Sequence, residues 1–197
     1  MNIRGFYAVL DRDDEQLARA LVGPGGARIL QVRMKPADTV DIVRVARMAR
    51  RICSEAGAVL VVNDRIDIAL AVGADGVHLG QTDVPIGDAR AISGELAIGV
   101  STHDLDQVVR AVAQRPAYIA YGPIFATTTK ANPDPVQGID ALRRAVIAAG
   151  DIPVVAIGGI TPTHARAIYA TGAAAICAIS AVNQASDVVA AARAFAT

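Results

Sequence analysis

Residues 59–83 read VLVVNDRIDIALAVGADGVHLGQTD, and this stretch decides the fold. Two short apolar runs, residues 59–62 and Gly76–Leu79, are too short for helices and are typical of buried strands, while the segment between them has helical spacing. Both runs end in polar residues that include a carboxylate, Asp64 after the first and Asp83 after the second. The stretch therefore predicts a strand–helix–strand unit with an acidic group just past the end of each strand.

The same unit repeats along the chain as a short β-rich run, a polar or glycine-bearing loop and an amphipathic helical run. Strands are expected at residues 6–10, 27–32, 58–62, 76–79, 97–100, 118–121, 153–157 and 174–179. Helices are expected at residues 14–21, 39–56, 65–72, 87–93, 105–114, 139–149, 162–171 and 186–196. Residues typical of helix ends support these bounds, with Thr39 and Thr161 as N-caps and Gly57, Gly73, Gly150 and Gly172 just after helices.

Most of these strands lack a polar/apolar alternation, which indicates burial on both faces, and their alternation with helices predicts parallel pairing. Eight such units in about 200 residues match the lower size limit of a closed barrel. An open, doubly wound sheet is the competing architecture. The barrel is favoured because no strand–helix turn carries a dinucleotide-type glycine fingerprint and because polar residues follow nearly every strand. We therefore expect one α/β domain over residues 1–197, a (β/α)8 TIM barrel.

Composition narrows the classes of partner. The chain has 197 residues, 53% of them hydrophobic, and its 19 basic and 19 acidic residues cancel. Without a block of like charge, neither nucleic acid nor a membrane surface is an expected partner, and small phosphorylated molecules are favoured. No secretion signal or membrane span is expected. Two cysteines in apolar segments indicate a reducing, cytoplasmic location, and the sequence leaves open whether the chain forms a homo-oligomer.

The second predicted strand ends in three polar side chains spaced two residues apart. Gln31, Arg33 and Lys35 share one face of an extended segment, so an amide, a guanidinium and an ammonium are presented together. Arg offers a planar fork to phosphate oxygens and Lys a point charge, which suits a polyanion such as a diphosphate. The alternative is that Arg33 and Lys35 only solvate a loop.

Asp64 and Asp83 are candidate ligands of a magnesium ion. Mg²⁺ usually takes one or two protein carboxylates and completes its shell with water and substrate phosphate. The structural alternatives are that Asp64, after Asn63, favours the start of the next helix and that Asp83 is a turn residue. His78 lies inside an apolar strand, where a hydrogen-bonded core histidine is the more common case, and is left out of the metal site.

The remaining loops supply candidate anion ligands without standing negative charge. Ser101 follows the fifth strand, where it could bind an anion or cap a helix. Residues 122–135 form a long loop rich in turn formers, with threonines and Lys130, which is typical of a mobile lid. Gly158 and Gly159 follow the seventh strand and predict a phosphate cradle of backbone N–H groups, with tight helix–strand packing as the alternative.

Six motifs run in order over nearly the whole chain. They are Gln31-x-Arg33-x-Lys35, Asn63-Asp64, His78-Leu79-Gly80-Gln81-x-Asp83, Gly99-Val100-Ser101-x-His103, Gly122-Pro123-Ile124-Phe125-x-Thr127-x-Thr129-Lys130 and Gly158-Gly159-Ile160. Together they resemble the thiamine phosphate synthase family. The resemblance implies a (β/α)8 barrel that joins 4-amino-2-methyl-5-hydroxymethylpyrimidine diphosphate to a thiazole phosphate, with Mg²⁺ as cofactor, and releases thiamine phosphate and diphosphate.

The resemblance also implies a role for each matching residue. The pyrimidine diphosphate would be held by Gln31, Val32, Arg33, Met34, Lys35, Asn63, Ser101 and Lys130, of which Arg33, Lys35, Ser101 and Lys130 would serve in catalysis. Magnesium would be bound by Asp64 and Asp83. The thiazole phosphate would be held by Thr127, Thr128, Thr129, Gly159, Ile179 and Ser180.

The chain departs from the family pattern at three positions. Ala126 stands where a proline is expected, and Cys177 and Ala178 replace bulkier or hydroxylated residues. Two other functions are kept open. A thiazole tautomerase would retain the cradle but is expected to carry a histidine at the position of Pro123, and a non-enzymatic sensor could lose the metal carboxylates.

Overall fold

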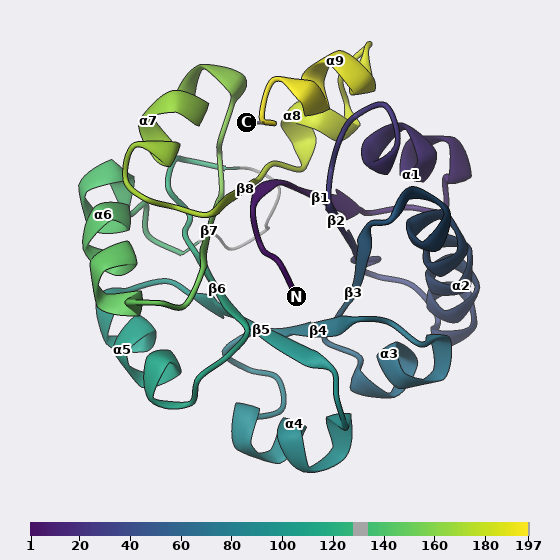
Figure 1. The fold of residues 1–197 in the computed structure, drawn as a ribbon, viewed down its shortest axis with the longest axis horizontal. Coiled ribbons are helices and arrows are strands. Elements are labelled where there is room, and N and C mark those ends of the chain that lie inside the picture. Colours follow the sequence, from purple (N-terminus) through teal and green to yellow (C-terminus); the bar gives the residue numbers. More distant parts are fainter. Residues whose placement is uncertain (128–133, 197) are drawn as a thin grey trace.

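The structure is a computed structural model that describes residues 1–127 and 134–196. Eight parallel strands pair in chain order, and β8 pairs with β1, which closes the barrel. Helices surround the barrel on the outside (Figure 1). The predicted (β/α)8 barrel is confirmed.

The elements follow one another along the chain as strand and helix. The strands are β1 Gly5–Leu10, β2 Ile29–Val32, β3 Val59–Asn63, β4 Gly76–Leu79, β5 Ala97–Thr102, β6 Tyr118–Tyr121, β7 Val154–Ile157 and β8 Ala175–Cys177. The α-helices are α1 Glu15–Val22, α2 Thr39–Ala56, α3 Ile66–Val72, α4 Ile86–Ser93, α5 Leu105–Ala113, α6 Gly138–Ala149, α7 Ala165–Tyr169, α8 Ser180–Asn183 and α9 Val188–Arg193. A 3-10 turn, η1 Pro162–His164, precedes α7.

Some predicted helix ends were wrong. Thr39 is the first residue of α2 rather than its N-cap, and Asp38 occupies the N-cap position without a side-chain bond. Thr161 does cap η1, in a reciprocal capping box with His164. The helix expected at residues 162–171 is divided into η1 and α7, whose last residue is Tyr169. The short helix α8 was not predicted.

The buried side chains form two layers. The larger layer lies between the strands and the surrounding helices, and a smaller one fills the barrel interior with residues that include Tyr7, Ile29, Val61 and Tyr118. The Tyr118 ring occupies the space in front of Gly99, where an added Cβ would lie 2.0 Å from the Tyr118 Cζ. The missing side chain on β5 therefore makes room for a phenol in the centre of the barrel.

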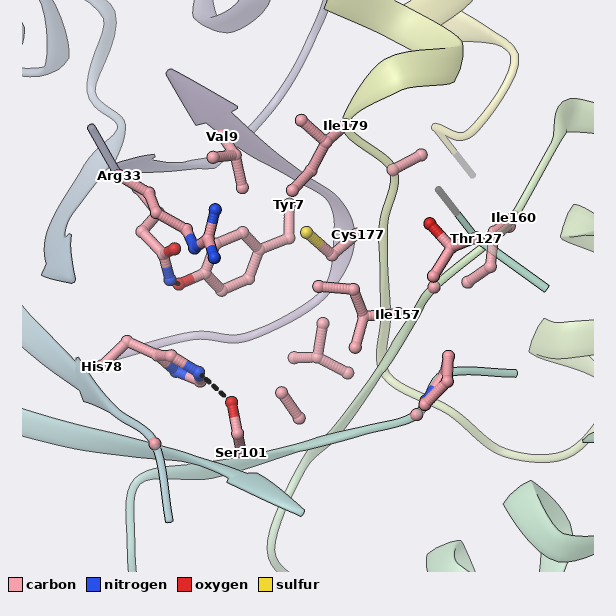
Figure 2. Close-up of a pocket in the computed structure, with 18 of the residues that line it drawn as sticks. Tyr7, Val9, Arg33, His78, Ser101, Thr127, Ile157, Ile160, Cys177 and Ile179 are labelled. Carbon is pink, nitrogen blue, oxygen red and sulfur yellow. Dashed lines mark hydrogen bonds between the residues drawn. The ribbon is translucent and has the colours of Figure 1, made fainter. Parts of the chain in front are cut away.

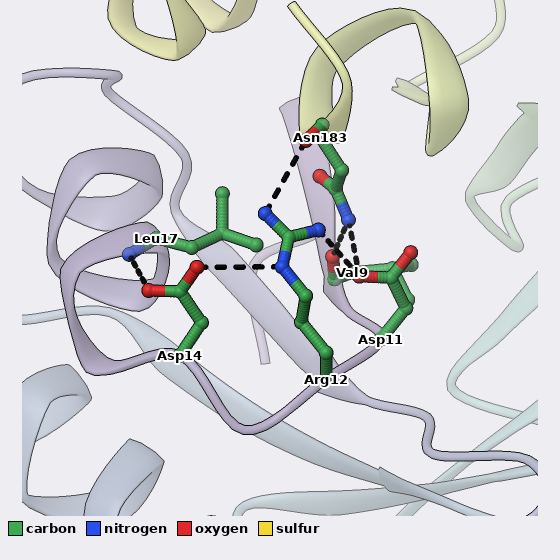
Figure 3. Close-up of polar contacts among 6 residues, drawn as sticks. All are labelled: Val9, Asp11, Arg12, Asp14, Leu17 and Asn183. Atoms are coloured by element: carbon green, nitrogen blue, oxygen red, sulfur yellow. Dashed lines mark hydrogen bonds and ion pairs between the residues drawn. The ribbon is translucent and has the colours of Figure 1, made fainter.

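A polar cluster fastens the loop after β1 to the last part of the barrel (Figure 3). The Asn183 Nδ2 group of α8 donates to the Val9 carbonyl at 2.9 Å and to the Asp11 carboxylate at 2.9 Å. Arg12 donates to the Asn183 carbonyl at 3.3 Å and to Asp14 at 3.3 Å. These bonds hold α8 against β1, at the place where the barrel closes.

Within the described residues, no helix has both the length and the apolar character needed to cross a lipid bilayer.

Candidate active site

A cavity of about 880 Å³ lies at the carboxyl ends of the strands. Every strand contributes at least one lining residue, and the loops after them complete the wall. Figure 2 shows side chains from several of these strands around the cavity. The volume falls in the range of small-molecule sites, and the position is the one at which (β/α)8 barrels place their active sites.

The predicted cationic side chains line one side of this cavity. Gln31 is buried, Arg33 is half-buried and Lys35 is exposed, so the three ascend from the floor to the rim. Val32 and Met34 differ from the expectation. Their side chains pack in the layer between barrel and helices, because residues alternate faces along an extended segment. Only their backbone atoms are placed to contribute to a site inside the barrel.

Asp64 and Asp83 come together at the rim, as predicted. The Lys35 ammonium lies 2.5 Å from the Asp64 Oδ2. Burial raises the pKa of Asp83, the Gly80 N–H bond at 2.7 Å opposes this, and the adjoining Asp64 carboxylate raises the pKa further. Among the described residues, no group of three or more acidic, histidine or cysteine side chains gathers. Two carboxylates suit a hard cation that takes its other ligands from water and phosphate.

The backbone of Asp64 argues against a helix-capping role. Its φ is +61°, in the left-handed region that few non-glycine residues adopt. Helix α3 begins at Ile66 with Arg65 at the N-cap position, and the Arg65 side chain makes no capping bond. The Asp64 N–H donates instead to the His78 carbonyl at 2.8 Å. The backbone conformation thus turns the carboxylate toward the cavity rather than toward the helix start.

The floor of the cavity carries five polar side chains joined by hydrogen bonds, here called the floor chain. The Gln31 Nε2 group donates to the Tyr7 hydroxyl at 2.9 Å, and the Tyr7 and Tyr118 hydroxyls lie 2.7 Å apart. His78 Nδ1 lies 2.9 Å from the Tyr118 hydroxyl, and His78 Nε2 lies 2.8 Å from the Ser101 Oγ, the bond drawn in Figure 2. The prediction of a hydrogen-bonded histidine on this strand is correct, but His78 also lines the cavity.

Burial sets the protonation of the floor. Burial and the nearby positive charge of Arg33 lower the pKa of His78 to about 4, so the imidazole is neutral near pH 7. Burial raises the pKa of the Cys177 thiol to about 12, against an opposing effect of Arg33. Burial also raises the pKa of Tyr7 and Tyr118, so both phenols keep their proton. Among the described residues, Arg33 therefore brings a positive charge to the interior.

The opposite wall is built from loops that approach one another closely. The Ile124 N–H donates to the Ile157 carbonyl at 2.9 Å and the Phe125 N–H to the Gly158 carbonyl at 3.0 Å. Gly159 has a φ of +64°, and an added Cβ would lie 2.3 Å from the Ala126 carbonyl oxygen. Close loop packing, the structural alternative to a phosphate cradle, thus explains the glycine by itself. Within the described chain, no atom accepts from the Gly159 N–H.

The remaining predicted residues divide into two groups. Thr128, Thr129 and Lys130 lie outside the described residues. The others line the cavity, namely Asn63, Ser101, Thr127, Gly159, Ile179 and Ser180, and so do the departures Ala126, Cys177 and Ala178. His103 also lines it, where its Nδ1–H donates to the Gly122 carbonyl at 2.7 Å.

Comparison with known proteins places the chain in a family. The family model described as thiamine monophosphate synthase matches residues 6–182. The chain belongs to the thiamine monophosphate synthase family. A thiamine-phosphate synthase of Chloroflexus aurantiacus is 46% identical over 86% of this chain and 78% of its own length. One of Methanoculleus marisnigri is 44% identical over 95% of this chain and 92% of its own.

A solved structure agrees with this assignment. The thiamine phosphate pyrophosphorylase from Pyrococcus furiosus superimposes with a TM-score of 0.90 at 36% identity, covering 98% of this chain and 94% of that one. The resemblance drawn from the six motifs is confirmed, and with it the expected function, thiamine phosphate synthesis by a transferase of this family.

Sequence reasoning missed the two tyrosines of this family member's floor. Tyr7 on β1 and Tyr118 on β6 were treated only as strand residues, yet both line the cavity. A signal was present, because a tyrosine inside a barrel strand needs a hydrogen-bond partner for its hydroxyl. The partner could not be named, since it lies on another strand, far away in the sequence.

Proposed function

We propose that this cavity joins 4-amino-2-methyl-5-hydroxymethylpyrimidine diphosphate to 4-methyl-5-(2-phosphoethyl)thiazole, or to its carboxylated form, and produces thiamine phosphate and diphosphate. One observation carries the proposal beyond the family assignment. The Asp64–Asp83 pair lies beside Lys35 on one side of the cavity, while the loop wall around Gly159 forms the other. Two different phosphate groups can thus be held in one pocket.

The carboxylate pair fits a magnesium ion, which we propose as the cofactor. Asp64 and Asp83 would hold it, and the bound ion would neutralise charge on the departing diphosphate. Lys35 is already paired with Asp64 and would remain beside the diphosphate. Arg33 adds a planar donor from the floor side. Ser101 and Asn63 would complete this half of the site, with Lys130 assigned by its motif alone.

The proposed reaction needs charge stabilisation rather than a base. The bond between the pyrimidine methylene carbon and the diphosphate oxygen breaks, and its electron pair leaves with diphosphate. The thiazole nitrogen then gives its lone pair to that carbon, and no proton is lost. This agrees with His78, whose two ring nitrogens both have hydrogen-bond partners. Preorganised positive charge at the leaving group is the main contribution of such a site.

The thiazole phosphate is assigned to the opposite wall. Gly159, Ile179 and Ser180 meet there with Thr127, and Thr128 and Thr129 follow in the same motif. The partners we propose are these small phosphorylated molecules, without nucleic acid or membrane. A cytoplasmic location is proposed because Cys53 and Cys177 are buried free thiols. Formation of a homo-oligomer is compatible with this assignment.

A reconstituted assay tests the proposal. The purified chain is mixed with Mg²⁺ and the two phosphorylated halves, and thiamine phosphate and diphosphate are measured. Formation of both products in equal amounts is the expected result. Conversion of the thiazole phosphate alone would identify a tautomerase, and tight binding without turnover would identify a sensor. Either of these outcomes contradicts the proposed coupling.

A charge-neutralising substitution tests the metal site. Asp83→Asn should lower Mg²⁺-dependent turnover by about a hundredfold or more, because one of two cation ligands loses its charge. Asp88→Asn, an exposed residue of the following helix α4, is the matched control and should leave the rate unchanged. Without Mg²⁺, Asp83→Asn should unfold at the same temperature or higher, because it removes a like-charge contact with Asp64. Equal rates for Asp83→Asn and the native chain would remove the pair from the mechanism.

A further inference from the structure

The floor chain connects two residues that face the cavity at separate places. Gln31 on β2 stands at one end and Ser101 on β5 at the other. Between them Tyr7, Tyr118 and His78 are all at least nine-tenths buried. Their bonds span 2.7 to 2.9 Å, well within hydrogen-bond range. The two substrate-facing ends are therefore joined through groups that the proposed reaction does not use.

The orientation of the Gln31 amide, with its Nε2 toward Tyr7, sets the direction of every bond in this chain. The Gln31 amide nitrogen donates to Tyr7, so the Tyr7 hydroxyl is an acceptor there. A phenol has a single hydrogen, and among the described residues the other partner of Tyr7 is Tyr118. Tyr7 therefore donates to Tyr118. By the same count the Tyr118 hydrogen is donated to the Nδ1 of His78.

The tautomer of His78 follows from this order. Because Nδ1 accepts from Tyr118, it carries no hydrogen, and the hydrogen of the ring lies on Nε2. The Nε2–H then donates to the Ser101 Oγ. Ser101 accepts this bond and keeps its own hydroxyl hydrogen for the cavity.

The hydrogen-bonding role of Gln31, at the other end of the floor chain, is also fixed. With its nitrogen directed at Tyr7, Gln31 leaves its Oε1 oxygen, to which none of the described residues donates. Gln31 lines the cavity, and its oxygen can only accept. Reversing either end would require every bond between them to reverse as well.

We propose that Tyr7, Tyr118 and His78 are positioning residues that hold Gln31 as a hydrogen-bond acceptor and Ser101 as a hydrogen-bond donor toward the substrate. The inference rests on the proposed function and deepens it. An acceptor at Gln31 matches an N–H donor such as the exocyclic amino group of the pyrimidine. A donor at Ser101 matches an anionic oxygen of the diphosphate. The floor chain thus favours binding of the pyrimidine diphosphate with its amino group at Gln31 and its diphosphate at Ser101.

The first test reads the tautomer directly and needs no substrate. Long-range proton–nitrogen NMR correlations of histidine-labelled protein distinguish Nε2–H from Nδ1–H rings. His103→Asn and His164→Asn variants leave His78 assignable among the three histidines of the chain. We expect His78 to be the neutral Nε2–H form. An Nδ1–H ring in the native chain would overturn the proposal, whatever reaction the protein catalyses.

The second test interrupts the floor chain in its middle. Tyr118→Phe keeps the ring and removes the hydroxyl, and should lower kcat/KM for the pyrimidine diphosphate by about tenfold while changing KM for the thiazole phosphate by less than about twofold. Tyr121→Phe is the matched control, because this tyrosine of the same strand β6 donates to Gln137 Oε1 at 3.0 Å, outside the floor chain. The control should keep native kinetics. If Tyr118→Phe does not fold, Tyr7→Phe is used instead, because it also interrupts the floor chain.

A double-mutant cycle shows whether the effect passes through Ser101. Tyr118→Phe combined with Ser101→Ala should be slowed by less than the product of the two single losses, since the hydroxyl that the floor chain orients at Ser101 is then absent and only the Gln31 end can still be affected. Full additivity of the two losses would overturn the proposal. A native chain that makes no thiamine phosphate would contradict the proposed function instead, while the NMR result would still decide the hydrogen-bond direction.

Discussion

At the scale of single residues, burial and a few charges decide what each side chain of the cavity can do. His78 is neutral and Cys177 stays a thiol, although both lie near the guanidinium of Arg33. Among the residues that the structure describes, Arg33 has no ion-pair partner, whereas Lys35 is paired with Asp64 at the rim. The two basic residues are not equivalent, because the unpaired one offers its charge to a ligand without first breaking an ion pair.

A substitution at Arg33 should separate the two substrate sites. Arg33→Gln should raise KM for the pyrimidine diphosphate by about ten- to a hundredfold, because a charge-assisted contact to phosphate is lost. KM for the thiazole phosphate should stay within about twofold. Arg47→Gln, an exposed position of α2, changes the net charge equally and should affect neither constant. Steady-state kinetics with each substrate varied in turn provides the measurement. Equal increases of both constants would show that the division into two sites is wrong.

At the scale of elements, two loops and the 3-10 turn η1 shape the wall opposite the carboxylates. The loop after β6 packs on the loop after β7 through main-chain bonds, and the Phe125 ring stacks on His164 with centroids 3.9 Å apart. Gly159 allows this approach. The position of the proposed thiazole phosphate site thus depends on backbone packing between two loops.

A methyl group at Gly159 should disturb this wall. Gly159→Ala should raise KM for the thiazole phosphate by about tenfold, because the new Cβ would collide with the Ala126 carbonyl oxygen. Gly73→Ala is a matched control, since Gly73 has the same φ of +64° after α3 but open space around it. Both variants should lose about 1 kcal/mol of stability from left-handed strain, and Gly159→Ala should lose more because of the collision. Only the first should change substrate affinity, and an equal effect of both would rule out a steric cause.

Removing the donor side chain of Asn183 should destabilise the protein less than replacing it with an acceptor. Asn183→Ala removes two hydrogen bonds but also a buried amide oxygen that has no partner within the described chain, so about 1 kcal/mol should be lost. Asn183→Asp directs an acceptor at the Val9 carbonyl and the Asp11 carboxylate, and should cost about 3 kcal/mol. Urea unfolding gives both values. A more stable Asp than Ala variant would contradict the donor role assigned to Nδ2.

Sequence patterns predicted the elements well wherever a regular period extends over several residues. The bounds of β4 and β6 agree fully, and α2 agrees at both ends, although its N-cap was misassigned. The short helix α8 escaped because four residues are too few for a helical period. Within the site, the spacing of Gln31, Arg33 and Lys35 predicted one face correctly. The floor chain could not be predicted, because its bonds join strands that are adjacent only in the closed barrel.

At the scale of the whole molecule, the fold buries both cysteines. Cys53 lies on the buried face of α2 and Cys177 lines the cavity, and burial raises the pKa of each thiol to about 12. The reactive thiolate therefore forms only at a pH far above the physiological range. Both residues can report on opening of the fold as a whole.

Thiol alkylation should follow global unfolding. At pH 8 neither Cys53 nor Cys177 should react with iodoacetamide in the native protein, because each pKa lies well above that pH and each side chain is buried. Both should react in urea, where the pKa returns to its ordinary value. Mass spectrometry of timed samples measures each site separately. Rapid modification of Cys177 alone in the native state would show that reagent reaches the thiol through the cavity.

The contact between Gly99 and Tyr118 has a consequence for how such chains diverge. A side chain at position 99 cannot be acquired while the Tyr118 ring occupies the same space. Loss of the ring first would open room for it, whereas the opposite order passes through a chain that cannot pack. During evolution the two substitutions can therefore occur only in one order, with loss of the tyrosine first. Once a side chain at position 99 fills the space, a tyrosine at position 118 can no longer be regained.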